Sequence, residues 1–204
     1  MIAIIDYGVG NLFSLRASLE RIGAKAAVTS DKAEIGRSDR IILPGVGAFE
    51  DAANKLRTSG LADVVLDEVK KGKPLMGICL GMQLLFERSY EFGCHEGLGL
   101  IKGSVKPLEG AIPPNLKIPQ IGWNRLEIVR PECPIFKYSA DGDYVYFVHS
   151  YYGADCDESV AAYTEYGKRV TAAVWNENVY GCQFHPEKSG EVGLKILRAF
   201  SEIN

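Results

Sequence analysis

The sequence lacks the features that mark several large classes of protein. No apolar run approaches the roughly 20 residues that a membrane-spanning helix needs, and no charged-then-apolar leader precedes Ile2. The 23 lysines and arginines are outnumbered by 26 aspartates and glutamates, which gives no electrostatic case for binding nucleic acid or an anionic membrane. We therefore expect a cytoplasmic protein that binds neither nucleic acid nor membrane.

The cysteines and histidines have neither the number nor the spacing that a disulfide framework or a metal site requires. The five cysteines are an odd number without a Cys-x-x-Cys pair, which argues against a disulfide framework and a zinc ribbon. The three histidines form no His-Glu-x-x-His or comparable ligand pattern. We expect reduced thiols, no metal and no cofactor.

Strands and helices alternate in the first half of the chain. Apolar runs predict strands over 2–5, 25–29, 40–43 and 74–78, and helical spacing predicts helices over 12–22, 49–56 and 61–69. This alternation predicts right-handed crossovers and a parallel sheet covered on both faces. Ligands of such a sheet gather at the carboxyl ends of its strands.

The second half has a different pattern. Strands are predicted over 98–101, 121–129, 143–148, 160–164, 170–175 and 179–184 without a long helix between them, and a final amphipathic helix covers 192–200. At 204 residues and 47% hydrophobic, the chain can bury one substantial core. We expect an α/β protein with a single flavodoxin-like domain over residues 1–204. Its mainly parallel central sheet would be flanked by helices, with additional antiparallel strands in the second half.

Cys79 lies where the period of the sequence changes from strand to helix. Residues 74–78 are apolar, and Leu80, Gln83, Leu84 and Glu87 follow at helical spacing. Gly77 and Gly81 flank the cysteine as Gly-x-Cys-x-Gly, the thiol counterpart of a nucleophile elbow. The start of a helix would favour the thiolate and would direct the Leu80 N–H toward an oxyanion. From this stretch alone, a small buried cysteine without a function is an equally good interpretation.

A second polar cluster favours the functional interpretation. The strand 179–184 ends in His185-Pro186-Glu187. A strand-end histidine is often merely solvated, but Pro186 fixes the backbone so that His185 and Glu187 can point to one site. Cys79, His185 and Glu187 then supply a nucleophile, a base and a group that orients the base. By contrast, Gly8-Val-Gly10 is only a partial dinucleotide fingerprint, because no third glycine follows.

Two of these motifs together identify a family. Residues 77–83 (Gly-Ile-Cys-Leu-Gly-Met-Gln) and 184–187 (Phe-His-Pro-Glu) resemble the class I (triad) glutamine amidotransferases. Further motifs resemble the glutaminase subunits of imidazole glycerol phosphate synthases, and the resemblance covers essentially the whole chain. These motifs lie at 6–11, 44–49, 97–101, 119–124, 148–152 and 185–190. The resemblance implies hydrolysis of glutamine to glutamate and ammonia. It also implies a heterodimer with a separate (βα)8 cyclase subunit, which uses the ammonia in histidine biosynthesis.

The resemblance also implies roles for single residues. Cys79 would form a glutamyl thioester, with His185, oriented by Glu187, as acid and base. The N–H groups of Val46 and Leu80 would bind the oxyanion. The positions that would hold the amino-acid end of glutamine are Gly47, Gln83, Glu91, Ser150 and Tyr151, although the backbone of the last two could do this instead. Positions expected to face the cyclase are Asn11, Trp123 and Asn124, with core packing as the alternative for Trp123.

Two other functions stay open at this stage. The glutaminase subunits of pyridoxal phosphate synthase and anthranilate synthase share the fold and the triad and differ in the acceptor of ammonia. The motifs at 6–11 and 120–124 distinguish this chain from those subunits. A non-catalytic interaction module of the same fold is disfavoured, because nucleophile, base and orienting carboxylate are all present.

Overall fold

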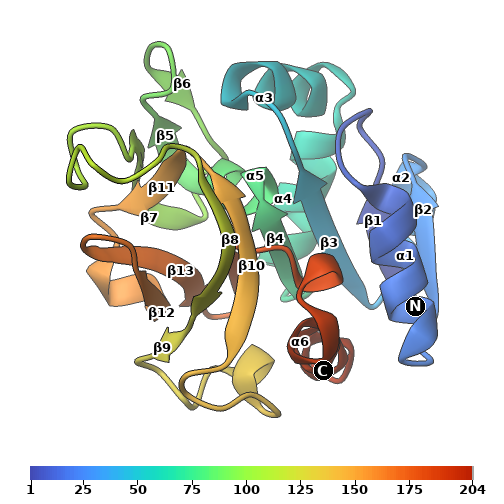
Figure 1. Ribbon diagram of the computed structural model, residues 1–204. Coiled ribbons are helices and arrows are strands. Elements are labelled where there is room, and N and C mark those ends of the chain that lie inside the picture. Colours follow the sequence, from blue (N-terminus) through green and yellow to red (C-terminus); the bar gives the residue numbers. More distant parts are fainter. Residues whose placement is uncertain (204) are drawn as a thin grey trace.

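The computed structural model describes residues 1–203 (Figure 1). The strands are β1 (Ile2–Ile5), β2 (Ala26–Thr29), β3 (Arg40–Gly45), β4 (Leu75–Cys79), β5 (Phe86–Ser89), β6 (His95–Glu96), β7 (Ile101–Pro107), β8 (Gln120–Arg125), β9 (Glu127–Ile128), β10 (Tyr144–His149), β11 (Tyr151–Ala154), β12 (Val160–Glu165), β13 (Arg169–Asn176) and β14 (Val179–Cys182). The helices are α1 (Leu12–Arg21), α2 (Lys32–Arg37), α3 (Phe49–Thr58), α4 (Leu61–Lys70), α5 (Leu80–Leu84) and α6 (Gly190–Ser201). Short 3₁₀ turns are η1 (Pro134–Phe136), η2 (Asp157–Ser159) and η3 (Pro186–Lys188).

The central sheet has eight strands in the order β2-β1-β3-β4-β14-β13-β12-β9. The pairs from β2 to β14 are parallel, and those from β14 to β9 are antiparallel. The parallel part has the flavodoxin-like order, with β14 as its fifth strand. The expected α/β fold with a mixed, mainly parallel sheet is therefore confirmed.

The parallel strands β1, β3, β4 and β14 contribute side chains to two separate cores, because successive residues of a strand point to opposite faces. On β1, Ala3 and Ile5 pack into the core that contains residues of α3 and α4. Ile2 and Ile4 pack into the core that contains residues of α1 and α6. All four are at most 3% exposed. Helices thus cover both faces of the parallel strands, as the continuous apolar runs predict.

Two smaller sheets accompany the antiparallel strands. The four-stranded sheet has the order β11-β7-β5-β6, and β8 pairs with β10 in a two-stranded ribbon. Phe86 of β5 belongs to the same core as α3 and α4, whereas Val145 and Phe147 of β10 belong to the core under α6. The ribbon β8–β10 and the small sheet therefore extend the covering layers beyond the helices, as Figure 1 shows.

The helix predicted after Cys79 is shorter than its sequence pattern indicates. It ends at Leu84, because the carbonyls of residues 84–86 accept hydrogen bonds from the backbone of Leu98, Gly99, Leu100 and Ile101. Glu87 lies instead in β5, which pairs with β7. The same contacts explain why residues 98–100 are not part of a strand. They serve as the partners that end α5.

Other boundaries differ from the predictions in smaller ways. The predicted strand 121–129 is divided into β8 and β9, and β9 pairs with β12 in the central sheet. Helix α2 was not predicted, although Asp31 accepts a hydrogen bond from the backbone N–H of Glu34, an N-cap that the spacing Asp-x-x-Glu indicates. Within residues 1–203, no helix is long and apolar enough to cross a membrane.

Candidate active site

Cys79 occupies a strained turn between β4 and α5. Its backbone φ is 54° and ψ is −111°, a conformation that costs free energy for a residue with a side chain. A Cβ atom on Gly81 would lie 1.9 Å from the Leu43 carbonyl oxygen, and one on Gly77 would lie 2.6 Å from the Gly81 oxygen. The flanking glycines are therefore required by close backbone contacts, and they hold Cys79 at the carboxyl end of the parallel sheet.

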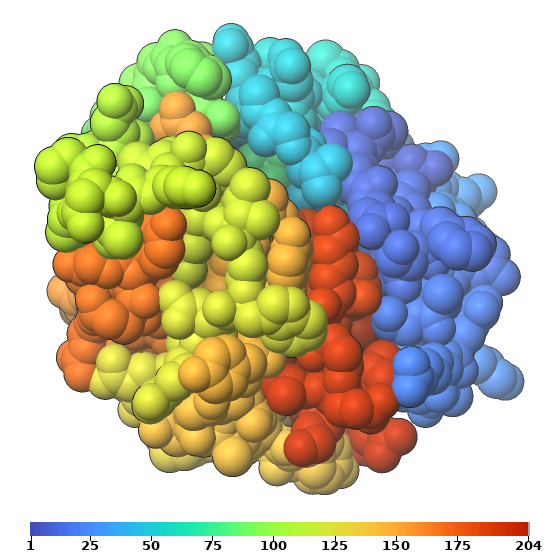
Figure 2. All heavy atoms as spheres, in the orientation of Figure 1, coloured from blue at the N-terminus to red at the C-terminus, as the bar shows by residue number. Residues whose placement is uncertain are grey.

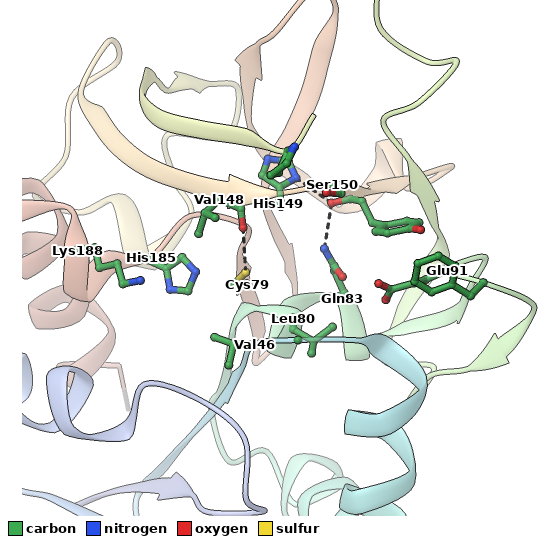
Figure 3. Close-up of a pocket in the computed structure, with 14 residues that line it drawn as sticks. Val46, Cys79, Leu80, Gln83, Glu91, Val148, His149, Ser150, His185 and Lys188 are labelled. Carbon is green, nitrogen blue, oxygen red and sulfur yellow. Dashed lines mark hydrogen bonds between the residues drawn. The ribbon is translucent and has the colours of Figure 1, made fainter. Parts of the chain in front are cut away.

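His185 reaches the same end of the sheet through strand register. β14 pairs in parallel with β4, and Cys182 lies beside Ile78. His185 follows three residues later, where its N–H donates to the Tyr146 carbonyl at 2.9 Å. In Figure 3 its ring faces Cys79 across the pocket. Nδ1 of His185 lies 2.8 Å from Oε1 of Glu187, and both side chains are 3% exposed. Because the carboxylate can only accept, Nδ1 carries a proton and Nε2 is the atom available to Cys79.

Opposing effects set the charge of His185. Burial lowers its pKa because it penalises the imidazolium, but the side chains of Cys79 and Glu187 outweigh burial and raise the pKa to about 9. The imidazolium is therefore favoured at neutral pH. It is the protonated partner that an adjacent thiolate needs.

The loop after β3 lies beside Cys79. Gly45, the last residue of β3, pairs in register with Cys79. Val46 is 43% exposed, and Gly47 has φ +93° with nothing within 4 Å of an added Cβ. The ends of the loop are held: Tyr7 donates its hydroxyl to the Pro44 carbonyl at 2.7 Å, and the Phe49 N–H donates to Glu91 at 2.7 Å. Val46 and Gly47, between these two anchors, are the exposed part of the loop.

Leu80 is the first residue of α5, so its N–H is free of helical partners and lies next to the thiol. However, α5 has five residues, little more than one turn, so few aligned peptide dipoles contribute to the field at Cys79. The stabilisation of a Cys79 thiolate that is expected from the start of the helix therefore comes mainly from the first N–H groups of α5.

A pocket of about 540 Å³ opens above Cys79. It is lined by nearly all the predicted site residues, which come from distant parts of the chain: Val46, Gly47, Cys79, Leu80, Gln83, Glu91, Ser150, Tyr151 and His185. Glu187 lies behind His185 rather than in the pocket wall. The volume of the pocket is typical of a site that binds a small molecule.

Three of the predicted substrate-binding residues already have partners inside the protein. The Gln83 amide donates to the Tyr151 carbonyl at 3.0 Å, so that backbone oxygen is engaged (Figure 3). The Glu91 carboxylate caps α3 through the Phe49 N–H, and burial raises its pKa while this hydrogen bond opposes the rise. A carboxylate held in this way still has a second oxygen with which to bind an ammonium group.

The pocket also contains residues to which the sequence analysis gave no site role, namely Phe92, Pro119, Val148, His149 and Lys188. His149 donates from Nδ1 to the Tyr151 carbonyl at 2.8 Å, and burial lowers its pKa to about 4, so it is neutral. Phe92 is 87% exposed and has a positive φ of 52°. His149 follows a predicted strand that ends near the site, whereas a positive φ at a phenylalanine leaves no signal in the sequence.

The three residues expected at an interface differ in their surroundings. Trp123 is 54% exposed and contacts Tyr146 edge-to-face, so its alternative assignment to the core is wrong. Asn11 lies beside a very small cavity that His185 and Glu187 also line. Asn124 instead donates its amide to the Glu165 carbonyl at 2.8 Å and accepts from the Arg125 N–H. These bonds give Asn124 a structural role within the chain.

The fold and this pocket define a class of enzyme. Residues 3–202 match the family described as Glutamine amidotransferase class-I. A solved glutamine amidotransferase superposes with a TM-score of 0.76, at 19% identity and over 100% of both chains. The PurLQS structure from Thermotoga maritima gives 0.75, at 22% identity, over 98% of this chain and 96% of that one. At these identities the structural likeness establishes the fold.

Sequence relatives narrow the assignment. The imidazole glycerol phosphate synthase subunit HisH of Syntrophotalea carbinolica is 48% identical over 207 residues, covering 100% of both chains. The subunit of that name from Caldanaerobacter subterraneus is 52% identical over 205 residues, covering 100% of this chain and 98% of the relative. The chain belongs to the class I glutamine amidotransferases and, within them, to the family of these HisH subunits. It is therefore a glutamine amidotransferase rather than a non-catalytic module.

Proposed function

We propose that this chain hydrolyses glutamine at Cys79 and delivers the ammonia to a (βα)8 cyclase subunit, with which it forms a heterodimer in the cytoplasm. The observation that carries the catalytic part is the meeting of a strained cysteine turn and a hydrogen-bonded His185–Glu187 pair in one pocket. The family membership supports glutamine as substrate and imidazole glycerol phosphate synthase as the assembly.

The first half of the reaction forms a thioester. The Cys79 thiolate attacks the side-chain amide carbon of glutamine, and the carbonyl oxygen becomes an oxyanion. The Leu80 N–H, at the start of α5, and the Val46 N–H, once the loop turns toward the pocket, bind that oxyanion. The C–N bond then breaks, and the His185 imidazolium donates its Nε2 proton to the nitrogen, which leaves as ammonia.

The second half releases glutamate. His185, now neutral, takes a proton from water as the oxygen attacks the thioester carbon, and the Cys79 thiolate leaves. Glu187 keeps the His185 ring in place through both halves and stabilises its charged form. Gly47, Gln83, Glu91, Ser150 and Tyr151 surround the amino-acid end of the substrate. Glu91 is the carboxylate among them and is suited to the substrate ammonium.

Ammonia released into water becomes ammonium, which is not a nucleophile, so the partner must cover the pocket. Figure 2 shows the face on which the yellow-green segment near residue 120, the red segment near residue 187 and the blue first segment meet. Ile121 and Trp123, two residues apart on β8, are 61% and 54% exposed. Apolar and aromatic groups of this kind are enriched at the centres of interfaces. Asn11, Trp123 and Asn124 are therefore the proposed contacts of the cyclase.

The exposed loop at Val46 and Gly47 provides a means of regulation. Binding of the cyclase, and of a ligand in its distant site, would favour the orientation in which the Val46 N–H faces the oxyanion. The isolated chain would then hydrolyse glutamine slowly, which avoids wasted ammonia.

The test is to measure glutamate formation by the isolated chain, by its complex with the purified cyclase, and by that complex with the cyclase ligand bound. We expect rates that rise by about tenfold or more at each step, each tenfold being worth about 1.4 kcal/mol of barrier. Equal rates in all three samples would contradict the proposed regulation. Absence of glutamate even in the complex with its ligand would contradict the proposed reaction.

A further inference from the structure

A buried glutamine, Gln183, contacts the sulfur of Cys79. It directly follows β14, and its side chain is 0% exposed. Its Nε2 lies 3.8 Å from Cys79 Sγ, and its Oε1 accepts from the Gln83 amide at 3.0 Å. Burying a primary amide is costly unless its hydrogen-bonding groups are used. Gln183 directs this amide at the reacting atom.

The neighbouring bonds fix which end of the Gln183 amide faces the sulfur. The Tyr151 carbonyl can only accept, so Gln83 must direct its NH₂ group toward it. The second hydrogen of that group then points at Gln183, which must present its oxygen there. The Gln183 nitrogen is left facing Cys79. The Tyr151 carbonyl, as a fixed acceptor, therefore sets the orientation of both amides, and the Gln183 N–H is directed at Sγ.

Donors and acceptors around Sγ favour different states of the sulfur. The Val148 carbonyl oxygen lies 4.0 Å away and can only receive the proton of a thiol. An amide N–H from Gln183 can bind a thiolate, and a hydrogen bond to a charged group is the stronger kind. We propose that Gln183 is a positioning residue for the nucleophile, which holds Sγ in the pocket and stabilises it as the thiolate.

Two titratable groups also influence the Cys79 sulfur, and their effects must be distinguished from that of Gln183. His185 faces Cys79 from the segment after β14. Tyr7, which follows β1, is buried, and burial together with the Cys79 charge raises its pKa well above the usual range. Both residues would be unchanged in a Gln183 variant. A change in the behaviour of the sulfur would therefore come from the amide.

The experiment measures iodoacetamide alkylation of Cys79 as a function of pH, resolved by peptide mass spectrometry. Exposed Cys94 on the same molecule serves as the internal reference. Gln183→Met keeps the length of the side chain and removes the donor. We expect its Cys79 alkylation at pH 7 to fall about tenfold relative to Cys94, and the midpoint of the rate against pH to rise by about one unit.

The matched control is Thr171→Val. Thr171 is 4% exposed, and its hydroxyl lies 3.8 Å from the sulfur of Cys156, away from the pocket. This variant also removes a buried polar group beside a thiol, so it reproduces the general cost of such a change. We expect its Cys79 profile to match the wild type. A Gln183→Met profile that also matches the wild type would overturn the proposal.

A second variant keeps the proposal testable if Gln183→Met does not fold. Gln83→Met removes the donor that orients the Gln183 oxygen and leaves Gln183 present. We expect a rise of the midpoint in the same direction but smaller, and an unchanged midpoint would count against the orienting network. The inference rests on Cys79 as the proposed nucleophile. Alkylation needs no turnover, however, so its outcome is separate from any failure of glutamine hydrolysis.

Discussion

Two strand ends lie side by side in the middle of the sheet, and the backbone around them holds them with different firmness. Cys79 ends β4, where Gly77 and Gly81 have no room for a Cβ atom. Gly45, its partner in register, ends β3 and leads into Val46 and Gly47, where an added Cβ on Gly47 meets nothing within 4 Å. The proposed nucleophile is therefore fixed by packing, whereas Val46 and Gly47 in the neighbouring loop are exposed, with open space around Gly47.

This difference suits the two tasks. A nucleophile gains most from a fixed position, because reaction rates depend steeply on the placement of the attacking atom. An oxyanion donor that can turn away lets the enzyme stay idle until a partner binds. The predictions below test each side of this comparison, beginning with the largest expected effect.

Replacing the nucleophile should abolish activity without unfolding the protein. We expect Cys79→Ala to lower glutamine turnover in the cyclase complex by at least about 10³-fold, because the covalent route is lost. Its free energy of unfolding should change by only about 1 kcal/mol, since one sulfur atom is removed from packing. The measurements are turnover and urea denaturation.

Cys94→Ala is the matched control, because Cys94 is exposed and outside the pocket. It should retain wild-type turnover. A reactive glutamine analogue should likewise label Cys79 and spare the four other cysteines. Substantial turnover by Cys79→Ala would rule out its role as nucleophile.

The fixed turn should be intolerant of a single methyl group. Gly81→Ala places a Cβ atom 1.9 Å from the Leu43 carbonyl oxygen, and we expect it to lower the free energy of unfolding by about 3 kcal/mol. Gly36→Ala is the control, because Gly36 lies in α2 and its Cβ would be 3.9 Å from the nearest atom. That change should be neutral or slightly stabilising. Similar denaturation midpoints for the two variants would contradict the steric account.

Loss of the orienting carboxylate should lower turnover less than loss of the nucleophile does, and it should change how turnover depends on pH. We expect Glu187→Gln to lower turnover by about 10²-fold. His185 must be protonated to release ammonia, so kcat/KM of the wild type should fall as pH rises through about 9. Loss of the Glu187 charge removes one cause of the raised pKa, and the falling limb should move to lower pH.

Turnover measured across pH for wild type, Glu187→Gln and Cys79→Ala decides this point. A Glu187→Gln variant as inactive as Cys79→Ala would contradict a purely orienting role. A falling limb that stays near pH 9 would show that the carboxylate does not influence His185.

A substitution in the exposed loop at Val46 and Gly47 should mainly change the activation by the cyclase. Gly47→Ala forces a side chain into φ +93°, which L-residues rarely adopt. The loop is exposed and can relax, so we expect a stability loss of about 1 kcal/mol. Activation by the cyclase should fall about tenfold, because the side chain at position 47 would restrict the loop that carries the Val46 N–H. Val46→Ala, which keeps the N–H and both glycines, should remain activatable; equal activation of the two variants would refute the role of Gly47.

Sequence patterns alone determined the parallel half of the fold and the chemistry at its edge. Apolar runs alternating with helical spacing predict β1, β3, β4 and the helices around them, since burial on both faces leaves a continuous apolar strand. Cys79 between two glycines and His185-Pro-Glu187 after a strand predict residues that the structure brings into one site. These signals are local, because strand ends and tight turns restrict which residues are allowed.

Only the tertiary structure decided the remainder. Helix α5 ends early because residues 98–101 bind the carbonyls of residues 84–86, and the Asn124 amide is engaged within the chain because Glu165 and Arg125 supply its partners. Gln183 looks like an ordinary strand residue until the parallel register of β14 and β4 places it beside Cys79. Each of these depends on at least one hydrogen-bond partner that lies outside the element concerned. No local period or turn residue encodes such a partner.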